Sequence, residues 1–234
     1  MYLKYDVKKY FNAIKALDST KVLDFGCNHA NFLNEKFTGE YIGLDIDSRI
    51  IKNNKKTYPQ HQWIHYNKYN YQYNCEYSTT DDWPDIPTGI ETAVAFSVFT
   101  HTTFDEFSYT TNKLKSHIAP GGDILATFFS SIDRDSIYKI LSHRQEYFSG
   151  HENYIVEKIS NKDVVYLCVN TVSNQILIFD NIKDLPKFSN HMYFLTFYND
   201  EWLSTKLQGH VVDVTDNFTN IMSTQKCLRL SITR

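Results

Sequence analysis

The chain has 234 residues, of which 42% are hydrophobic and 22% are charged, and its formal net charge at pH 7 is -3. This length and composition suit one packed core, so we expect a single domain over residues 1–234. A chain without excess positive charge is a poor match to a phosphate backbone, which argues against nucleic acid as a partner. No apolar run approaches the roughly 20 residues of a membrane span, and the first residues lack the apolar core of a signal peptide. We therefore expect a cytoplasmic protein without a membrane partner.

The four cysteines are widely separated and form no CxxC pair, and no histidines cluster at metal-ligand spacing. This pattern predicts neither a disulfide framework nor a metal site, so we expect free thiols and no bound metal. The cysteines are Cys27, Cys75, Cys168 and Cys227.

Apolar periodicity predicts an alternation of strands and helices along most of the chain. An amphipathic helix is expected within residues 1–20, and a second after the first loop, where Leu33 and Phe37 have helical spacing. Four further helices are expected: one from the N-cap Ser48, one from the capping box of Thr103, one over 136–141 and one from Asp200. The expected strands of the main sheet are 21–24, 40–47, 62–66, 92–96, 123–129, 211–214 and 227–232, with a turn at 119–122 and a long polar aromatic loop over 67–87.

A different pattern fills residues from about 145 to 195. Short apolar runs at 154–156, 164–169 and 175–179 are separated by polar turns, which predicts short strands. The alternation before this region is typical of a doubly wound α/β protein. We therefore predict a mostly parallel, seven-stranded, Rossmann-like sheet with a β-rich insertion, or lid, after strand five.

The loop after the first strand contains the chemistry that separates two cofactor classes. A dinucleotide site needs glycines at the first, third and sixth loop positions, where this chain has Gly26, Asn28 and Asn31. Asp24 would also place a carboxylate beside the phosphates. A cofactor with an ammonium group and no phosphate fits better, and S-adenosylmethionine has both properties. Asp45, at the end of the second strand, is then positioned to accept from the ribose hydroxyls.

Four motifs in this order make the chain resemble the class I, Rossmann-like S-adenosylmethionine-dependent methyltransferases over about residues 21–130, with weaker similarity at 200–234. They are Val22-Leu23-Asp24-Phe25-Gly26-Cys27, Gly43-Leu44-Asp45, Ser97-Val98-Phe99-Thr100-His101 and Pro120-Gly121-Gly122. The resemblance implies a methyltransferase that binds S-adenosylmethionine.

The resemblance also implies the role of each cofactor-binding residue. Asp24 and Gly26 would lie at the methionine end, with Cys27 and Asn28 in the same loop, and Asp45 at the ribose. Ile46 would pack on the adenine, Asn67 would cap the adenine edge where the family usually has Asp, and Ser97 and Val98 would lie under the sulfonium. The chain departs from the family pattern at Asn28 and Ala30, which replace two loop glycines.

His101 is the candidate catalytic base, because it follows the fourth strand and histidine titrates near working pH. It could instead only orient the cofactor or cap the helix that begins after Thr103; His29 is a weaker candidate. The favoured acceptor is a hydroxyl of a small polar metabolite, such as a sugar or a capsule or surface-polysaccharide precursor. The alternatives are an amine or protein side chain, a non-catalytic cofactor-binding module and, most distantly, an NAD-dependent oxidoreductase. The sequence leaves the oligomeric state open.

Overall fold

The computed structural model describes residues 18–30, 32–33, 37–68, 70, 82–184, 192–212 and 224–233. The helix expected within residues 1–20 therefore lies outside the described residues up to residue 17. The same holds for residues 69 and 71–81 of the predicted polar aromatic loop, for Cys75, and for the end of the strand predicted over 211–214. The three described cysteines have free thiols.

Seven of the described strands form the predicted doubly wound sheet, in the order β3-β2-β1-β4-β5-β10-β9. The first five are parallel, β10 runs antiparallel to β5, and β9 runs antiparallel to β10. Their bounds are Lys21–Phe25 (β1), Glu40–Asp45 (β2), Gln62–His65 (β3), Ile90–Ala95 (β4), Ile118–Ser130 (β5), His210–Val212 (β9) and Gln225–Ser231 (β10).

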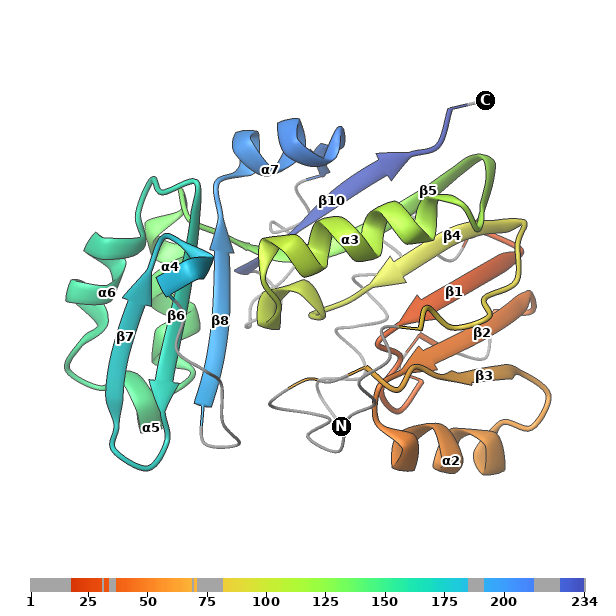
Figure 1. Ribbon diagram of the computed structural model, residues 1–234, viewed down its shortest axis with the longest axis horizontal. Coiled ribbons are helices and arrows are strands. Elements are labelled where there is room, and N and C mark those ends of the chain that lie inside the picture. The colour runs from red at the N-terminus through yellow and green to blue at the C-terminus, as the bar shows by residue number, and fades with distance from the viewer. Residues whose placement is uncertain are drawn as a thin grey trace.

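Three further strands branch from the end of β5. They are β6 (Val164–Asn170), β7 (Gln175–Phe179) and β8 (Met192–Tyr198), in the order β8-β6-β7, with antiparallel pairing between them. Phe129 of β5 pairs with β10 on one edge and with Phe197 of β8 on the other. On that second edge of β5, strand β4 pairs only as far as Ala126 of β5, so β8 continues the sheet beyond the point where β4 ends. The carboxyl ends of β1, β2 and β4 therefore point toward the three-stranded branch (Figure 1).

Both faces of the parallel sheet are buried, which explains why its strands are continuous apolar runs. Leu23 and Phe25 of β1 belong to the core that includes Phe107 and Leu114 of α3, whereas Val22 belongs to the core on the opposite face. Figure 1 shows α3 lying across β4 and β5. The main-sheet helices are α2 (Ser48–Thr57), the short η2 (Phe99–His101), α3 (Phe104–Lys115) and α7 (Asp200–Leu207).

Helices α4, α5 and α6 pack against the branch strands in a core of their own. They form the part of the molecule at the far end from β1–β3 (Figure 1), together with β6, β7 and β8. Their bounds are Arg134–Ser142, Gln145–Phe148 and Glu152–Ile159, and a short η3 covers Ile182–Asp184.

Two predicted elements are wrong. The strand predicted at 154–156 is part of helix α6, because Ile155, Val156 and Ile159 are buried together on one helical face. The helix predicted after the first loop is absent at Leu33 and Phe37, where the described backbone is irregular; residues 34–36 lie outside the described residues.

Smaller differences concern element ends. The turn predicted at 119–122 is an irregularity within β5: the register with β4 shifts there, and the segment bonds instead to Ile232 through Gly121 and Gly122. Asp47, one residue before the predicted Ser48, is the N-cap of α2. The capping box of Thr103 and Glu106 is confirmed. Strand β8 was not predicted.

Candidate functional site

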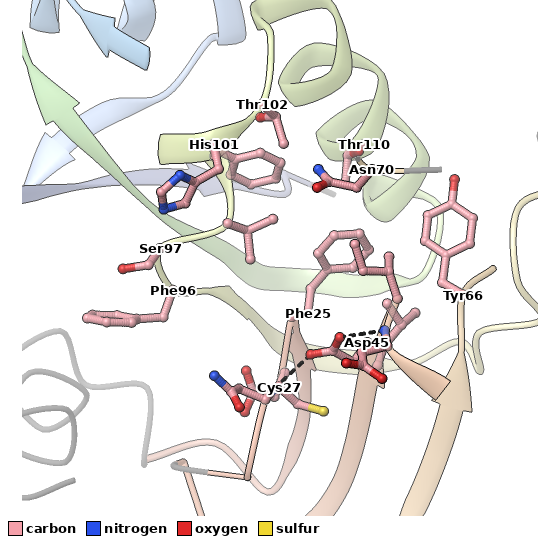
Figure 2. A pocket seen from close by; sticks show the side chains of 18 of the residues that line it. Phe25, Cys27, Asp45, Tyr66, Asn70, Phe96, Ser97, His101, Thr102 and Thr110 are labelled. Atoms are coloured by element: carbon pink, nitrogen blue, oxygen red, sulfur yellow. Dashed lines mark hydrogen bonds between the residues drawn. The ribbon is translucent and has the colours of Figure 1, made fainter. Parts of the chain in front are cut away.

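A cavity of about 460 Å³ lies at the carboxyl ends of β1, β2 and β4. Its size falls within the roughly 300–1,000 Å³ of small-molecule sites, and its position matches the ligand crevice of open α/β sheets. The loop after β1, the end of β2 and the segment from β4 into η2 supply most of its wall (Figure 2). Residues Glu106 and Thr110 of α3 also line it.

Asp24 is the most deeply buried acid of the cavity wall, with 3% of its surface exposed. The Tyr41 hydroxyl donates to Asp24 Oδ2 at 2.8 Å. Burial raises the pKa of Asp24 to about 7, although the Tyr41 hydrogen bond opposes the increase and nearby Asp45 adds to it. A buried carboxyl with one donor is under-compensated when ionised, so it favours a positively charged ligand.

The first loop turns sharply at Gly26, which has φ +78°. A side chain there would overlap Val98 Cγ2, so both the backbone and the neighbouring segment require glycine. The amides of Gly26 and Cys27 donate to the Leu44 carbonyl at 2.8 and 2.9 Å, and the Ala30 amide donates to the Cys27 carbonyl. Because these N–H groups are already used within the protein, they are not available to cradle a phosphate.

Asn28 and Ala30 keep a glycine-like backbone although neither is glycine. Their φ angles are +45° and +55°. Asparagine tolerates this region, but alanine adopts it at a cost of about 1–2 kcal/mol. Asn54 of α2 helps to hold the loop, since its side-chain Nδ2 donates to the Asn28 carbonyl at 2.6 Å. The loop therefore retains its shape through contacts with α2 and β2.

Asp45 connects the end of β2 with this loop. Its two carboxylate oxygens accept from the Asn28 amide and from the Asp47 amide, both at 2.9 Å. Burial raises the pKa of Asp45, and these two hydrogen bonds oppose the increase. Each carboxylate oxygen has a second lone pair, so Asp45 can still accept from a diol at the cavity wall.

Ser97 begins the opposite wall in a left-handed conformation, with φ +57°. Its amide donates to Thr127 Oγ1 of β5 at 2.7 Å, and its carbonyl accepts from Thr100 Oγ1 at 3.0 Å. A non-glycine residue in this region is strained and persists only where its surroundings hold it. Ser97 is thus a fixed point of the wall.

His101 is the last residue of η2, and its ring contacts strand β8. Its Nδ1 is 2.8 Å from the Phe194 carbonyl, which can only accept, so Nδ1 carries the hydrogen and Nε2 the lone pair of the neutral ring. The pKa of His101 is lowered to about 4: burial is the main cause, the Phe194 hydrogen bond opposes the decrease, and the positive charge of Arg144 adds to it. The expectation that His101 titrates near working pH is therefore wrong: the ring is neutral throughout the physiological range.

Nine of the ten site residues predicted from the sequence line this one cavity. The exception is Asn67, which is exposed; its neighbours Lys68 and Asn70 line the cavity instead. His29 is exposed and is not among the lining residues. The nine are Asp24, Gly26, Cys27, Asn28, Asp45, Ile46, Ser97, Val98 and His101.

The residues that support the site from neighbouring elements were not predicted from the sequence. Tyr41 and Asn54 contact Asp24 and Asn28 from β2 and α2. Glu106 and Thr110 could have been found, because helical spacing places them on one face of a helix that starts at the cavity. In the described ranges, no three His, Cys, Asp or Glu side chains gather as metal ligands would. Among the helices of those ranges, none has the length and apolarity needed to cross a bilayer.

Comparison with solved structures identifies the fold. A protein of Pyrococcus horikoshii OT3 matches with a TM-score of 0.55 and 11% identity, over 98% of this chain and 91% of that chain. A S-adenosylmethionine-dependent methyltransferase from Clostridium acetobutylicum ATCC 824 matches with a TM-score of 0.53 and 12% identity, over 100% and 93% of the two chains. The magnesium protoporphyrin IX methyltransferase of Synechocystis PCC 6803, with bound SAH, matches with a TM-score of 0.51 and 9% identity, over 99% and 83%.

No protein-family model matches the sequence, and no curated protein matches it. The structural matches show that the chain has the α/β fold of S-adenosylmethionine-dependent methyltransferases.

Proposed function

We propose that the protein is a methyltransferase that uses S-adenosylmethionine and acts on a small polar metabolite, at a hydroxyl of a sugar or surface-polysaccharide precursor. The observation that carries the proposal is the pairing of Asp24 and Asp45 in one cavity whose loop amides are already bonded. Two carboxylates suit an ammonium group and a ribose diol, and they repel a pyrophosphate. The shared fold supports the same cofactor.

The residues present fit this cofactor from end to end. Asp24 would bind the ammonium group, with Gly26, Cys27 and Asn28 forming the loop beside it. Asp45 would accept from the ribose hydroxyls, and Ile46 would cover the adenine. Lys68 and Asn70 also line the cavity, and they take the place of Asn67 in our assignment of the adenine edge.

When bound, S-adenosylmethionine supplies an electrophilic methyl group, and the protein's task is mainly alignment. Ser97 and Val98, which line the cavity, would form its wall on the side of the reacting centre. His101 is the proposed base: its Nε2 would accept the proton of the acceptor hydroxyl, while Nδ1 stays bonded to Phe194. Because burial lowers its pKa to about 4, His101 accepts this proton only when charge develops on the acceptor, which limits its contribution.

Methyl transfer to paired acceptors tests the proposal. The purified protein is given S-adenosylmethionine with an isotope-labelled methyl group and a pool of sugars and polyols, each matched by its amino analogue. We expect labelled methyl ethers. Labelled amines would favour an N-methyltransferase, and cofactor binding without any labelled product would favour a non-catalytic cofactor-binding module.

Asp45→Ala tests the assignment of the ribose end. Loss of a charged acceptor from a buried diol should cost roughly 1.5–3 kcal/mol of cofactor affinity. Titration calorimetry measures this loss, and a thermal melt of the same variant shows whether the protein remains folded. Unchanged affinity in a folded variant would show that Asp45 does not contact the ribose.

A further inference from the structure

Gln225 of β10 is a buried polar residue outside the set of cavity-lining residues, and only 4% of its surface is exposed. Its Nε2 donates to Ser97 Oγ at 2.6 Å. Its Oε1 is buried and accepts no hydrogen bond in the described part of the chain. An amide kept in a core at the cost of an unpaired oxygen requires a reason beyond packing.

The hydrogen bond fixes the direction of the Ser97 hydroxyl. In the opposite amide orientation Ser97 would donate to Oε1, and the NH₂ group would then be left unpaired. Orphaned N–H groups in protein interiors are rarer than under-satisfied carbonyls, so the observed orientation is the favourable one. Because Nε2 occupies a lone pair of Ser97 Oγ, the hydroxyl hydrogen is left to donate elsewhere.

The backbone of Ser97 supports the same conclusion. Its amide and carbonyl are bonded to Thr127 and Thr100, and it holds a strained φ of +57°. Every other polar group of Ser97 is thus already used. Ser97 lines the cavity, and Figure 2 shows it on the same side as His101.

We propose that Gln225 is a positioning residue that fixes the Ser97 hydroxyl as a hydrogen-bond donor in the cavity, and that this donor selects hydroxyl acceptors over amines. The proposal rests on the methyltransferase function proposed above. A hydroxyl oxygen has two lone pairs, so one can form the new bond to the methyl carbon while the other accepts from Ser97. The methyl–sulfur bond would break with release of S-adenosylhomocysteine, and the hydroxyl proton would pass to Nε2 of His101. An amine nitrogen has a single lone pair, and attack uses it. With an amine acceptor the Ser97 donor is left without a partner, which is costly in a buried site.

Gln225→Glu tests the proposal with almost no change in size. Burial should raise the pKa of the introduced carboxyl, as it does for Asp24, so the variant is compared with the wild type at about pH 9, where the carboxyl is ionised. The carboxylate can only accept, so the Ser97 hydroxyl turns toward it and is lost to the acceptor. We expect the kcat/KM for alcohols in the matched pool to fall at least tenfold and the preference for alcohols over amines to narrow by a similar factor. Calorimetry on the SAH-loaded protein should show the same loss in alcohol binding, without any chemical step. The affinity for SAH itself should change less than twofold.

The pH profile separates positioning from a merely structural role. When the introduced carboxyl is protonated it can donate to Ser97 Oγ as the amide did, so alcohol binding by Gln225→Glu should recover as the pH falls. Gln225→Met is the matched control, because it removes the hydrogen bond but has no group to titrate. It should lose alcohol binding without any recovery at low pH.

Three results would overturn the proposal. They are equal alcohol binding in wild type and Gln225→Glu at about pH 9, a loss in Gln225→Glu that does not recover at low pH, and a wild-type protein that binds or methylates amines as well as alcohols. Failure of SAH to bind the wild type would instead overturn the proposed function.

Discussion

Asp24 is the side chain at which cofactor binding and folding stability make opposite demands. Its burial raises its pKa to about 7, so the folded protein holds the proton more tightly than the unfolded chain does. The stability that this proton provides is fully present below the unfolded pKa of 3.8 and is lost as the pH rises through 7. The ionised form that an ammonium ligand needs is therefore the less stable form of the free protein.

Asp24→Asn should separate the two effects. The variant keeps an oxygen for the Tyr41 hydroxyl but has no charge to bury, so above pH 7 it should be more stable by up to roughly 4 kcal/mol, at 1.36 kcal/mol per pKa unit. It should bind S-adenosylmethionine at least tenfold more weakly, because a charge-assisted hydrogen bond is lost. Thermal melts and titration calorimetry measure the two quantities. A variant that is both less stable and equal in affinity would contradict this role.

For His101 we expect an effect on turnover rather than on cofactor affinity. His101→Ala should lower turnover with little change in cofactor affinity, because the ring lies beyond the cofactor-binding loops and contacts β8. Since burial lowers its pKa to about 4, the turnover of the wild type should show no histidine inflection between about pH 5.5 and 8. Steady-state rates at saturating cofactor across this range provide the measurement. Equal turnover in the variant would remove His101 as the base.

The loop after β1 has its shape because of Gly26. In Gly26→Ala the alanine must adopt a positive φ, and its methyl group also overlaps Val98 Cγ2. Gly89→Ala is the matched control, because Gly89 has φ +75° and open space around it. Both variants should lose about 1–2 kcal/mol from the backbone, and Gly26→Ala roughly 1–3 kcal/mol more from overpacking. Denaturant unfolding compares them. Equal losses of unfolding free energy in the two variants would mean that the contact between Gly26 and Val98 adds nothing to the requirement for glycine.

The elements predicted correctly are those whose signal is local. Buried parallel strands such as β1 and β4 are short apolar runs, and the capping box at Thr103 lies within four residues of sequence. The strand predicted at 154–156 was wrong because three consecutive apolar residues fit either a strand or a helix, and only Ile159 reveals the helical spacing. Strand β8 is an apolar and aromatic run with Thr196 as its one polar residue, and it was open to prediction.

The cavity was predictable only in part, for a related reason. An acid or a glycine at the end of an apolar run indicates a ligand-binding loop from a few neighbouring residues alone, so Asp24, Gly26 and Asp45 were found. Tyr41 and Gln225 act across the sheet, through pairings that no sequence window contains. The lowered pKa of His101 depends on its burial against β8. To predict it, one would have had to predict both strand β8 and its position beyond the end of β4.

For the molecule as a whole, the pKa of Asp24 links proton release to cofactor binding. Below pH 7 the free protein holds the Asp24 proton, and an ammonium ligand must displace it. The affinity for S-adenosylmethionine should therefore rise up to about tenfold per pH unit as the pH approaches 7, and then level off. Calorimetry in buffers of different ionisation enthalpy should detect the released proton at pH 6. A flat affinity profile, or the same profile in Asp24→Asn, would contradict the linkage.

The most direct test of the acidic, phosphate-excluding cavity is titration calorimetry of the wild-type protein with three ligands. S-adenosylmethionine should bind saturably. Methylthioadenosine, which lacks the sulfonium charge and the whole amino acid end with its ammonium group, should bind at least tenfold more weakly, and NADH should not bind. No binding of S-adenosylmethionine at millimolar concentration, or tight binding of NADH, would contradict the assignment of the cavity.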